Sequence, residues 1–132
     1  MATKELNVIV KTKELCTYIF TVTASSPKKF RFTLVDRMLN ISLSAISYIY
    51  QANDVFIRNE QDVKRMEERV YYQRKAMTQL KLLGFLSHIA CEQQCILPKQ
   101  FEKNSRMIYS SCNMLGGWIN ADIRRIKQMG QR

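Results

Sequence analysis

Residues that build turns and strands are scarce in this chain. Its 132 residues include four glycines and two prolines, too few for a many-stranded β protein. Histidine occurs once, which excludes a His-based acid–base pair, and no glycine-rich phosphate loop is present. No run approaches the ~18 apolar residues of a membrane span, so we expect no membrane partner.

The beginning of the chain lacks a basic stretch followed by a long apolar run. We therefore expect no secretory signal peptide and a cytoplasmic location. In a reducing cytoplasm the four cysteines are expected to be free thiols.

Positive charge is what the chain has in excess. It contains 21 lysines and arginines against 11 acids, a formal net charge of +10. Such an excess favours an anionic partner, which can be nucleic acid, an acidic protein surface or anionic lipid. The simpler interpretation is a soluble protein that happens to be basic. The length and the 46% hydrophobic content predict one globular domain, residues 1–132, with a single core.

Apolar residues recur at spacings of three and four, which is the period of an amphipathic helix. The longest such stretch opens with Pro98, a residue that suits a first helical turn. We predict a short arm at 1–7 and helices at about 8–24, 27–57, 61–92 and 98–128. A strand is the alternative for part of the first segment, because CTYIFTVTA is rich in β formers. Helix is preferred because no second strand is available to pair with it.

Helices joined by short links fold back on one another, so the predicted fold class is all-α, an up-and-down antiparallel four-helix bundle. In that topology the first and third links share one end of the bundle, and the second link lies at the other with the chain termini. In the third helix, Gln73 interrupts the apolar stripe, and Arg69 lies on the opposite side, which is predicted to face solvent.

Catalytic and metal chemistry have weak signals. The carboxylates of Asp36, Asp54, Glu92 and Asp122 are scattered, and no Glu-x-x-His pair exists. His88, Cys91 and Cys95 lie near one helix end, with Cys112 as a possible fourth ligand. Zinc sites have tighter pairs, and cysteine is commonly a small buried hydrophobe. We predict no metal, no cofactor and no enzymatic activity, with a small metal-dependent enzyme at these residues as a remote alternative.

Gly116, Gly117 and Trp118 form a candidate interface. A glycine inside a helix costs about 1 kcal/mol relative to alanine, so the pair needs an explanation. Either a neighbouring helix packs closely within the bundle, or another subunit approaches with Trp118 as its anchor.

Aromatic residues are interleaved with basic ones. Phe30 and Phe32 flank Arg31, and Tyr71 and Tyr72 lie between Arg69 and Arg74. Aromatic rings stack on bases while cations bind phosphates. The alternative is that Phe30 and Phe32 close the end of the core and the charges form a solvated face. For the surface as a whole we favour an anionic partner.

Three stretches together resemble one bacterial family of four-helix bundles. They are SPKKFRFTLVDRM at 26–38, YQAND at 50–54, and LPKQFEKNS with MLGGWI at 97–105 and 114–119. The family includes the accessory variability determinant of diversity-generating retroelements. The proteins encoded in intervening sequences of large-subunit ribosomal RNA genes belong to the same broad family.

The resemblance implies a basic homopentamer that binds a reverse transcriptase and RNA or DNA, in support of error-prone cDNA synthesis. The chemistry would belong to the polymerase, and this protein would be non-catalytic. The alternative is a stand-alone protein-interaction module of the ribosomal intervening-sequence type without a retroelement role. The candidate nucleic-acid-binding residues are Lys28, Lys29, Arg31 and Arg37 at the second helix start, and Arg124, Arg125 and Lys127 near the end of the fourth.

Overall fold

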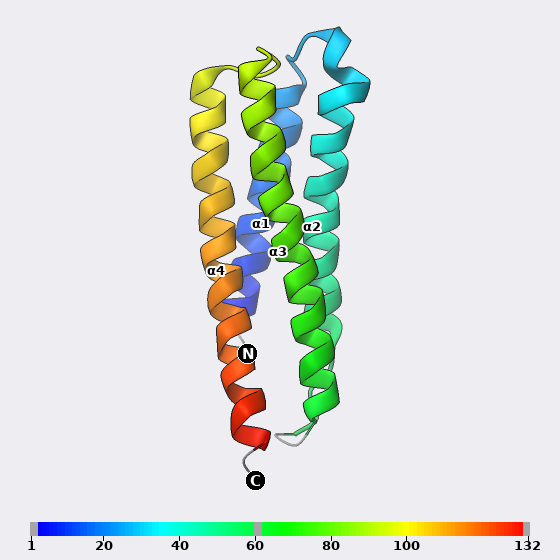
Figure 1. Ribbon diagram of the computed structural model, residues 1–132, viewed down its shortest axis with the longest axis vertical. Helices are drawn as coiled ribbons and strands as arrows, with labels where there is room; N and C mark the ends of the chain where they lie inside the picture. The colour runs from blue at the N-terminus through cyan, green and yellow to red at the C-terminus, as the bar shows by residue number, and fades with distance from the viewer. Residues whose placement is uncertain (1–2, 60–61, 131–132) are drawn as a thin grey trace.

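The computed structural model describes residues 3–59 and 62–130, and within them all regular structure is helical. The α-helices are α1 (Thr3–Thr23), α2 (Asp36–Asp54), α3 (Val63–Glu92) and α4 (Pro98–Gly130). Each runs antiparallel to the next (Figure 1). Helix α1 packs against α2, α2 against α3, α3 against α4, and α4 against α1. This arrangement confirms the predicted all-α, up-and-down four-helix bundle.

The first and third links meet at the upper end of the bundle as it is drawn in Figure 1. There the Ser26 hydroxyl donates a hydrogen bond of 2.8 Å to the Cys95 carbonyl oxygen. The link between α2 and α3 lies at the opposite end, beside the last turns of α4. The topology had predicted this distribution of links, and it fixes which cations share an end of the molecule.

The tight third link follows from how α3 ends. Gln94 adopts a left-handed conformation with a φ of 65°. The Cys95 N–H bonds to the Ala90 carbonyl at 2.7 Å, and the Gln94 N–H bonds to Cys91 at 3.0 Å. This is the Schellman arrangement, which pairs the last carbonyls of a helix. Cys95 and Ile96 are buried just beyond it, so the chain turns at once into α4.

The core is formed by the helix faces that the spacing of three and four predicts. Met38, Ile49, Leu80, Leu83 and Leu115 are fully buried. Burial of one such side chain is worth about 1.5–3 kcal/mol relative to exposure. The core face of the bundle is therefore set by the apolar periodicity of the sequence.

The helix boundaries differ from the prediction at several places. Residues 3–7 belong to α1 and not to an arm, because they contain no glycine or proline to break a helix; residues 1 and 2 lie outside the described part. The third helix begins at Val63, and of the predicted start at 61–62, residue 61 also lies outside it. Helix α2 ends at Asp54, since Val55 is extended with a ψ of 112°. Phe56, which lies within the predicted helix at 27–57, is beyond this end and is 68% exposed.

The start of the second helix is irregular. Pro27 is extended, with a ψ of 141°, and a 3₁₀ turn (Lys28–Phe30) and a π-helical segment (Arg31–Val35) precede α2. A π turn holds more residues than an α turn and so changes which side chains face inward. Phe30 is buried, whereas Phe32 is 78% exposed. Of the two aromatic rings considered as plugs for the core, only Phe30 is one.

Gly84 offers a direct test of helix stability in α3. A methyl group at this position would meet no atom within 4 Å beyond its own turn. We expect Gly84→Ala to raise the free energy of unfolding by about 0.5–1 kcal/mol, because it restricts the unfolded chain without creating a clash. Urea denaturation followed by circular dichroism measures this. Gly130→Ala, at the end of α4 with equally open surroundings, is the control, with a smaller gain expected. A loss of stability in Gly84→Ala would contradict the packing described for α3.

Candidate nucleic-acid interface

The predicted nucleic-acid-binding residues fall into two groups at opposite ends of the bundle. Lys28, Lys29 and Arg31 precede α2 at the upper end, with Arg37 in its first turn. The others, Arg124, Arg125 and Lys127, lie in the last turns of α4. All of these residues are exposed. A helix rises 1.5 Å per residue, so α4 carries the second group about 40 Å from the first. The structure does not bring the two groups into one site.

Two residues of the upper group line a small hollow beside the first link. Lys28 and Arg31 line this hollow of about 290 Å³ together with Ser25 and Ser26. The Lys29 ammonium lies 5.1 Å from the centroid of the Phe30 ring. The exposed ring of Phe32 is in the same segment. Cations next to an exposed aromatic ring are the combination that binds phosphates and stacks on a base.

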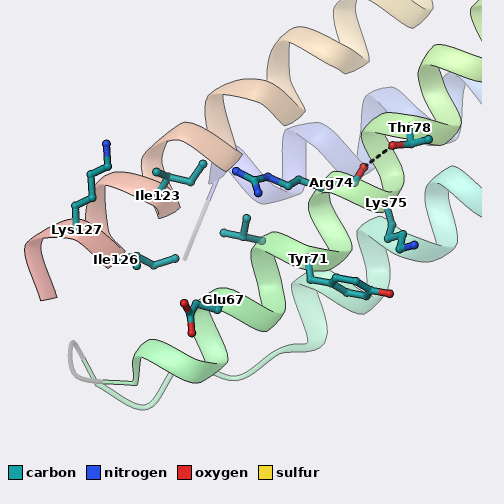
Figure 2. A pocket seen from close by; sticks show the side chains of 9 residues that line it. Glu67, Tyr71, Arg74, Lys75, Thr78, Ile123, Ile126 and Lys127 are labelled. Atoms are coloured by element: carbon teal, nitrogen blue, oxygen red, sulfur yellow. Dashed lines mark hydrogen bonds between the residues drawn. The ribbon is translucent and has the colours of Figure 1, made fainter. Parts of the chain in front are cut away.

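The lower group does not act as a unit. Arg125 forms an ion pair of 3.7 Å with Asp122, which partly neutralises it. Lys127 instead lines a groove between α3 and α4, together with Arg74 and Lys75 (Figure 2). We call this the α3–α4 groove; its lining residues are Glu67, Val70, Tyr71, Arg74, Lys75, Thr78, Ile123, Ile126 and Lys127, and its volume is about 600 Å³.

Arg74 and Lys75 were missed as site residues by the sequence reasoning. The signal was present, because the Tyr71, Tyr72 and Arg74 cluster is visible in the sequence. What was lacking is the axial alignment of α3 with α4, which places Lys127 opposite Arg74 and Lys75. Spacing within one helix does not give that alignment.

Most surface cations have no acidic partner. Within residues 7–59 and 62–130, ion pairs join Asp62 to Arg65, Glu92 to His88, and Asp122 to both Arg69 and Arg125. No ion pair is formed there by the other lysines and arginines, including Lys28, Lys29, Arg31, Arg37, Arg74, Lys75, Arg124 and Lys127. The positive charge of the chain is therefore displayed on its surface and available to an anion.

One cation is buried, contrary to the prediction that it faces solvent. Arg69 is 6% exposed, and its Nε and Nη2 atoms donate to the two oxygens of Asp122, each at 2.9 Å. Gln73 Nε2 donates to Asp122 Oδ2 at 2.8 Å, which explains the polar interruption of the α3 stripe. A buried carboxylate in bidentate geometry offsets part of the cost of burying the guanidinium. The cluster joins α3 to α4.

The candidate interface needs a correction at Trp118. Its side chain is 3% exposed and lies over Arg69, with the guanidinium carbon 5.7 Å from the ring centroid. Trp118 is therefore a core residue and not a surface anchor. A methyl group at Gly116 would touch only Met77 Cε, at 3.8 Å, an ordinary contact. Packing within the chain does not require glycine at 116, and the role of Gly116 and Gly117 in an interface stays a prediction.

Two of the cysteines, Cys16 and Cys112, are buried or partly buried and are poor nucleophiles. Burial raises the pKa of the Cys16 and Cys112 thiols, so both stay protonated at neutral pH, whereas nucleophiles and ligands are thiolates. His88 Nε2 lies 3.4 Å from Glu92 Oε1, one helical turn further along α3. Among the described residues, no three His, Cys, Asp or Glu side chains are grouped closely enough to hold a metal ion. Nor does any helix in that part of the chain contain an apolar stretch long enough to cross a membrane.

Fold and surface define the chain as a basic four-helix bundle with unpaired cations at both ends and along one groove. No protein-family model matches the chain, and no curated protein sequence matches it.

Proposed function

We propose that this protein is a non-catalytic accessory protein of a diversity-generating retroelement. In this role it binds the reverse transcriptase of the element and its RNA or DNA, and supports mutagenic cDNA synthesis. The observation that carries the proposal is the set of exposed lysines and arginines with no acidic partner, on a chain with a net charge of +10. The resemblance of residues 26–38 and 114–119 to the family indicates that the biological setting is a retroelement.

The stretches that resemble the family combine buried apolar residues with exposed cations. In residues 26–38, Phe30, Leu34 and Met38 are buried, whereas Lys28, Lys29 and Arg31 are exposed. One short stretch thus both closes the core and presents cations. In residues 114–119, Leu115, Trp118 and Ile119 are buried, so that motif supports the fold.

Phosphate contacts would dominate the binding of nucleic acid. Each phosphate neutralised by a lysine or arginine releases condensed counterions, which makes affinity fall steeply with salt. The two cationic ends are about 40 Å apart along α4, so a nucleic acid that reaches both lies along the bundle. Self-association into a homo-oligomer, a pentamer by the resemblance, would repeat each patch and raise avidity without new contacts.

Reconstituted cDNA synthesis tests the accessory role. A reverse transcriptase whose gene adjoins that of this protein is assayed on its template RNA with and without the protein. We expect the protein to co-purify with the enzyme and to stimulate cDNA synthesis. Equal synthesis with and without it, together with no co-purification, would contradict the retroelement role.

A protein-interaction module without a retroelement role is the second candidate. Large apolar side chains are exposed away from the cationic ends, notably Phe85 at 60% and Tyr109 at 68%. Exposed aromatic side chains are enriched where proteins meet. A genome with no reverse-transcriptase gene beside this one, and a protein without measurable affinity for RNA or DNA, would favour this candidate.

A further inference from the structure

We infer that the α3–α4 groove binds an acidic amphipathic helix of a partner protein. The inference is largely separate from nucleic-acid binding at the ends of the bundle, because Lys127 is the one lining residue of the groove that is also a candidate nucleic-acid-binding residue. The expected ligand has aliphatic side chains on one helical face and Asp or Glu side chains beside them.

The floor of the groove fits aliphatic side chains. It is formed by Val70 from α3 and by Ile123 and Ile126 from α4. Val70 belongs to the core cluster, and the two isoleucines are partly buried against it. A ligand side chain seated here would bury apolar surface on a floor that is already in place. At about 600 Å³, the groove falls within the volume range of sites that bind ligands.

The rim of the groove selects for negative charge. Arg74, Lys75 and Lys127 line it (Figure 2). None of these three forms an ion pair within the described residues. Glu67 is the one acid among the lining residues. A carboxylate at Arg74 would form charge-assisted hydrogen bonds, bidentate in the best geometry. Groove and ligand are thus complementary in charge as well as in polarity.

The walls of the groove are held in place from beneath. Arg69 and Asp122 precede the lining residues Val70 and Ile123, and their bidentate bond joins the two helices. Gln73 adds a second bond to the same carboxylate. A site on helices that are already fixed loses little entropy when a ligand binds. The Thr78 hydroxyl donates a hydrogen bond of 3.2 Å to the Arg74 backbone carbonyl in the same helix. This bond does not involve the Arg74 guanidinium, which stays available to the ligand.

A peptide fits this groove better than a nucleic acid does. Stacking of a base needs a free aromatic face, and the floor is aliphatic. Tyr71 is the aromatic residue of the rim, but the Lys75 ammonium lies 5.3 Å from its ring centroid. The centroid of the Tyr72 ring also lies 5.4 Å from that of the Tyr71 ring, in an edge-on arrangement.

Fluorescence anisotropy with a designed peptide tests the inference. The probe is a fluorescein-labelled synthetic helix with leucines on one face and glutamates on the other. One control peptide has serines in place of the leucines, and a second has lysines in place of the glutamates. We expect the full-length protein to bind the probe at least ~10-fold more tightly than either control.

Variants then locate the site. Arg74→Glu with Lys127→Glu is expected to weaken probe binding ~10-fold or more. The control, Lys64→Glu with Lys81→Glu, makes the same change in charge on α3 outside the groove and is expected to leave it within ~2-fold. Equal loss in both double variants would overturn the inference, because it would mean general charge attraction. Binding of the serine peptide as tightly as the probe would do the same.

Two further outcomes separate this site from the proposed function. A labelled oligothymidine whose binding, unlike that of the peptide, is lost in Arg74→Glu with Lys75→Glu, a variant that keeps Lys127, would assign the groove to nucleic acid and overturn the inference. Conversely, Lys28→Glu, Lys29→Glu and Arg31→Glu together are expected to spare peptide binding. Loss of nucleic-acid binding with peptide binding retained would show that the two sites are separate, whereas loss of peptide binding in this triple variant would overturn the inference.

Discussion

Replacing Asp122 with alanine is expected to destabilise the protein by about 3–5 kcal/mol, because it removes the carboxylate that forms a bidentate bond with the buried Arg69 guanidinium. Both hydrogen bonds of 2.9 Å between these side chains and the bond from Gln73 are lost at once. Arg69 is 6% exposed, so water cannot replace them. Urea denaturation followed by circular dichroism measures the change.

Two controls separate the buried pair from the exposed one. Arg125 also lies near Asp122, at 3.7 Å, but is exposed, so Arg125→Ala is expected to cost less than ~1 kcal/mol. Replacing Arg69 with methionine, and Gln73 and Asp122 with leucine, together is expected to restore most of the lost stability, since apolar side chains often substitute for a buried polar cluster. A loss below ~1 kcal/mol in Asp122→Ala would show that Arg69 reaches solvent.

Reversing Lys28, Lys29 and Arg31 to glutamate is expected to lower the affinity for RNA ~10- to 100-fold at physiological salt. The change removes exposed cations beside the exposed Phe32 ring and brings the net charge from +10 to +4. The slope of log affinity against log salt should become shallower, because fewer counterions are released. Anisotropy with a labelled structured RNA measures both quantities.

The control for this prediction carries the same charge change elsewhere. Lys11→Glu, Lys64→Glu and Lys81→Glu together also give a net charge of +4, on exposed sites of α1 and α3. We expect a smaller loss of affinity from this variant. Equal losses in the two triple variants would indicate that net charge, and not the upper group, governs binding.

The fold could be predicted from the sequence because it is determined by a periodic spacing of apolar residues. Apolar residues at spacings of three and four gave the buried faces, and short links with few glycines and prolines left antiparallel packing as the solution. The irregular start of the second helix had no such signal. A π-helical segment at Arg31–Val35 depends on how Phe30 and Leu34 reach the core, which propensities do not encode.

The candidate site was less accessible to sequence reasoning. Exposed cations at both ends were identified, but Arg69 was assigned to solvent, because a lone arginine gives no sign of a partner 53 residues away at Asp122. Gln73, out of place in an apolar stripe, was the visible sign of a buried polar cluster. Trp118 was a candidate interface residue for a similar reason. A tryptophan in an amphipathic helix suits a core as well as an interface, and the burial of its side chain assigns it to the core.

The salt dependence of nucleic-acid binding by the unmodified protein tests the account most directly. Structured RNA, single-stranded DNA and duplex DNA are each titrated by anisotropy across a range of sodium chloride. The account predicts tight binding at low salt, and an affinity that falls steeply and linearly in log salt because phosphate contacts dominate. No binding to any of the three at low salt would contradict it, and would mean that the positive surface serves a protein partner.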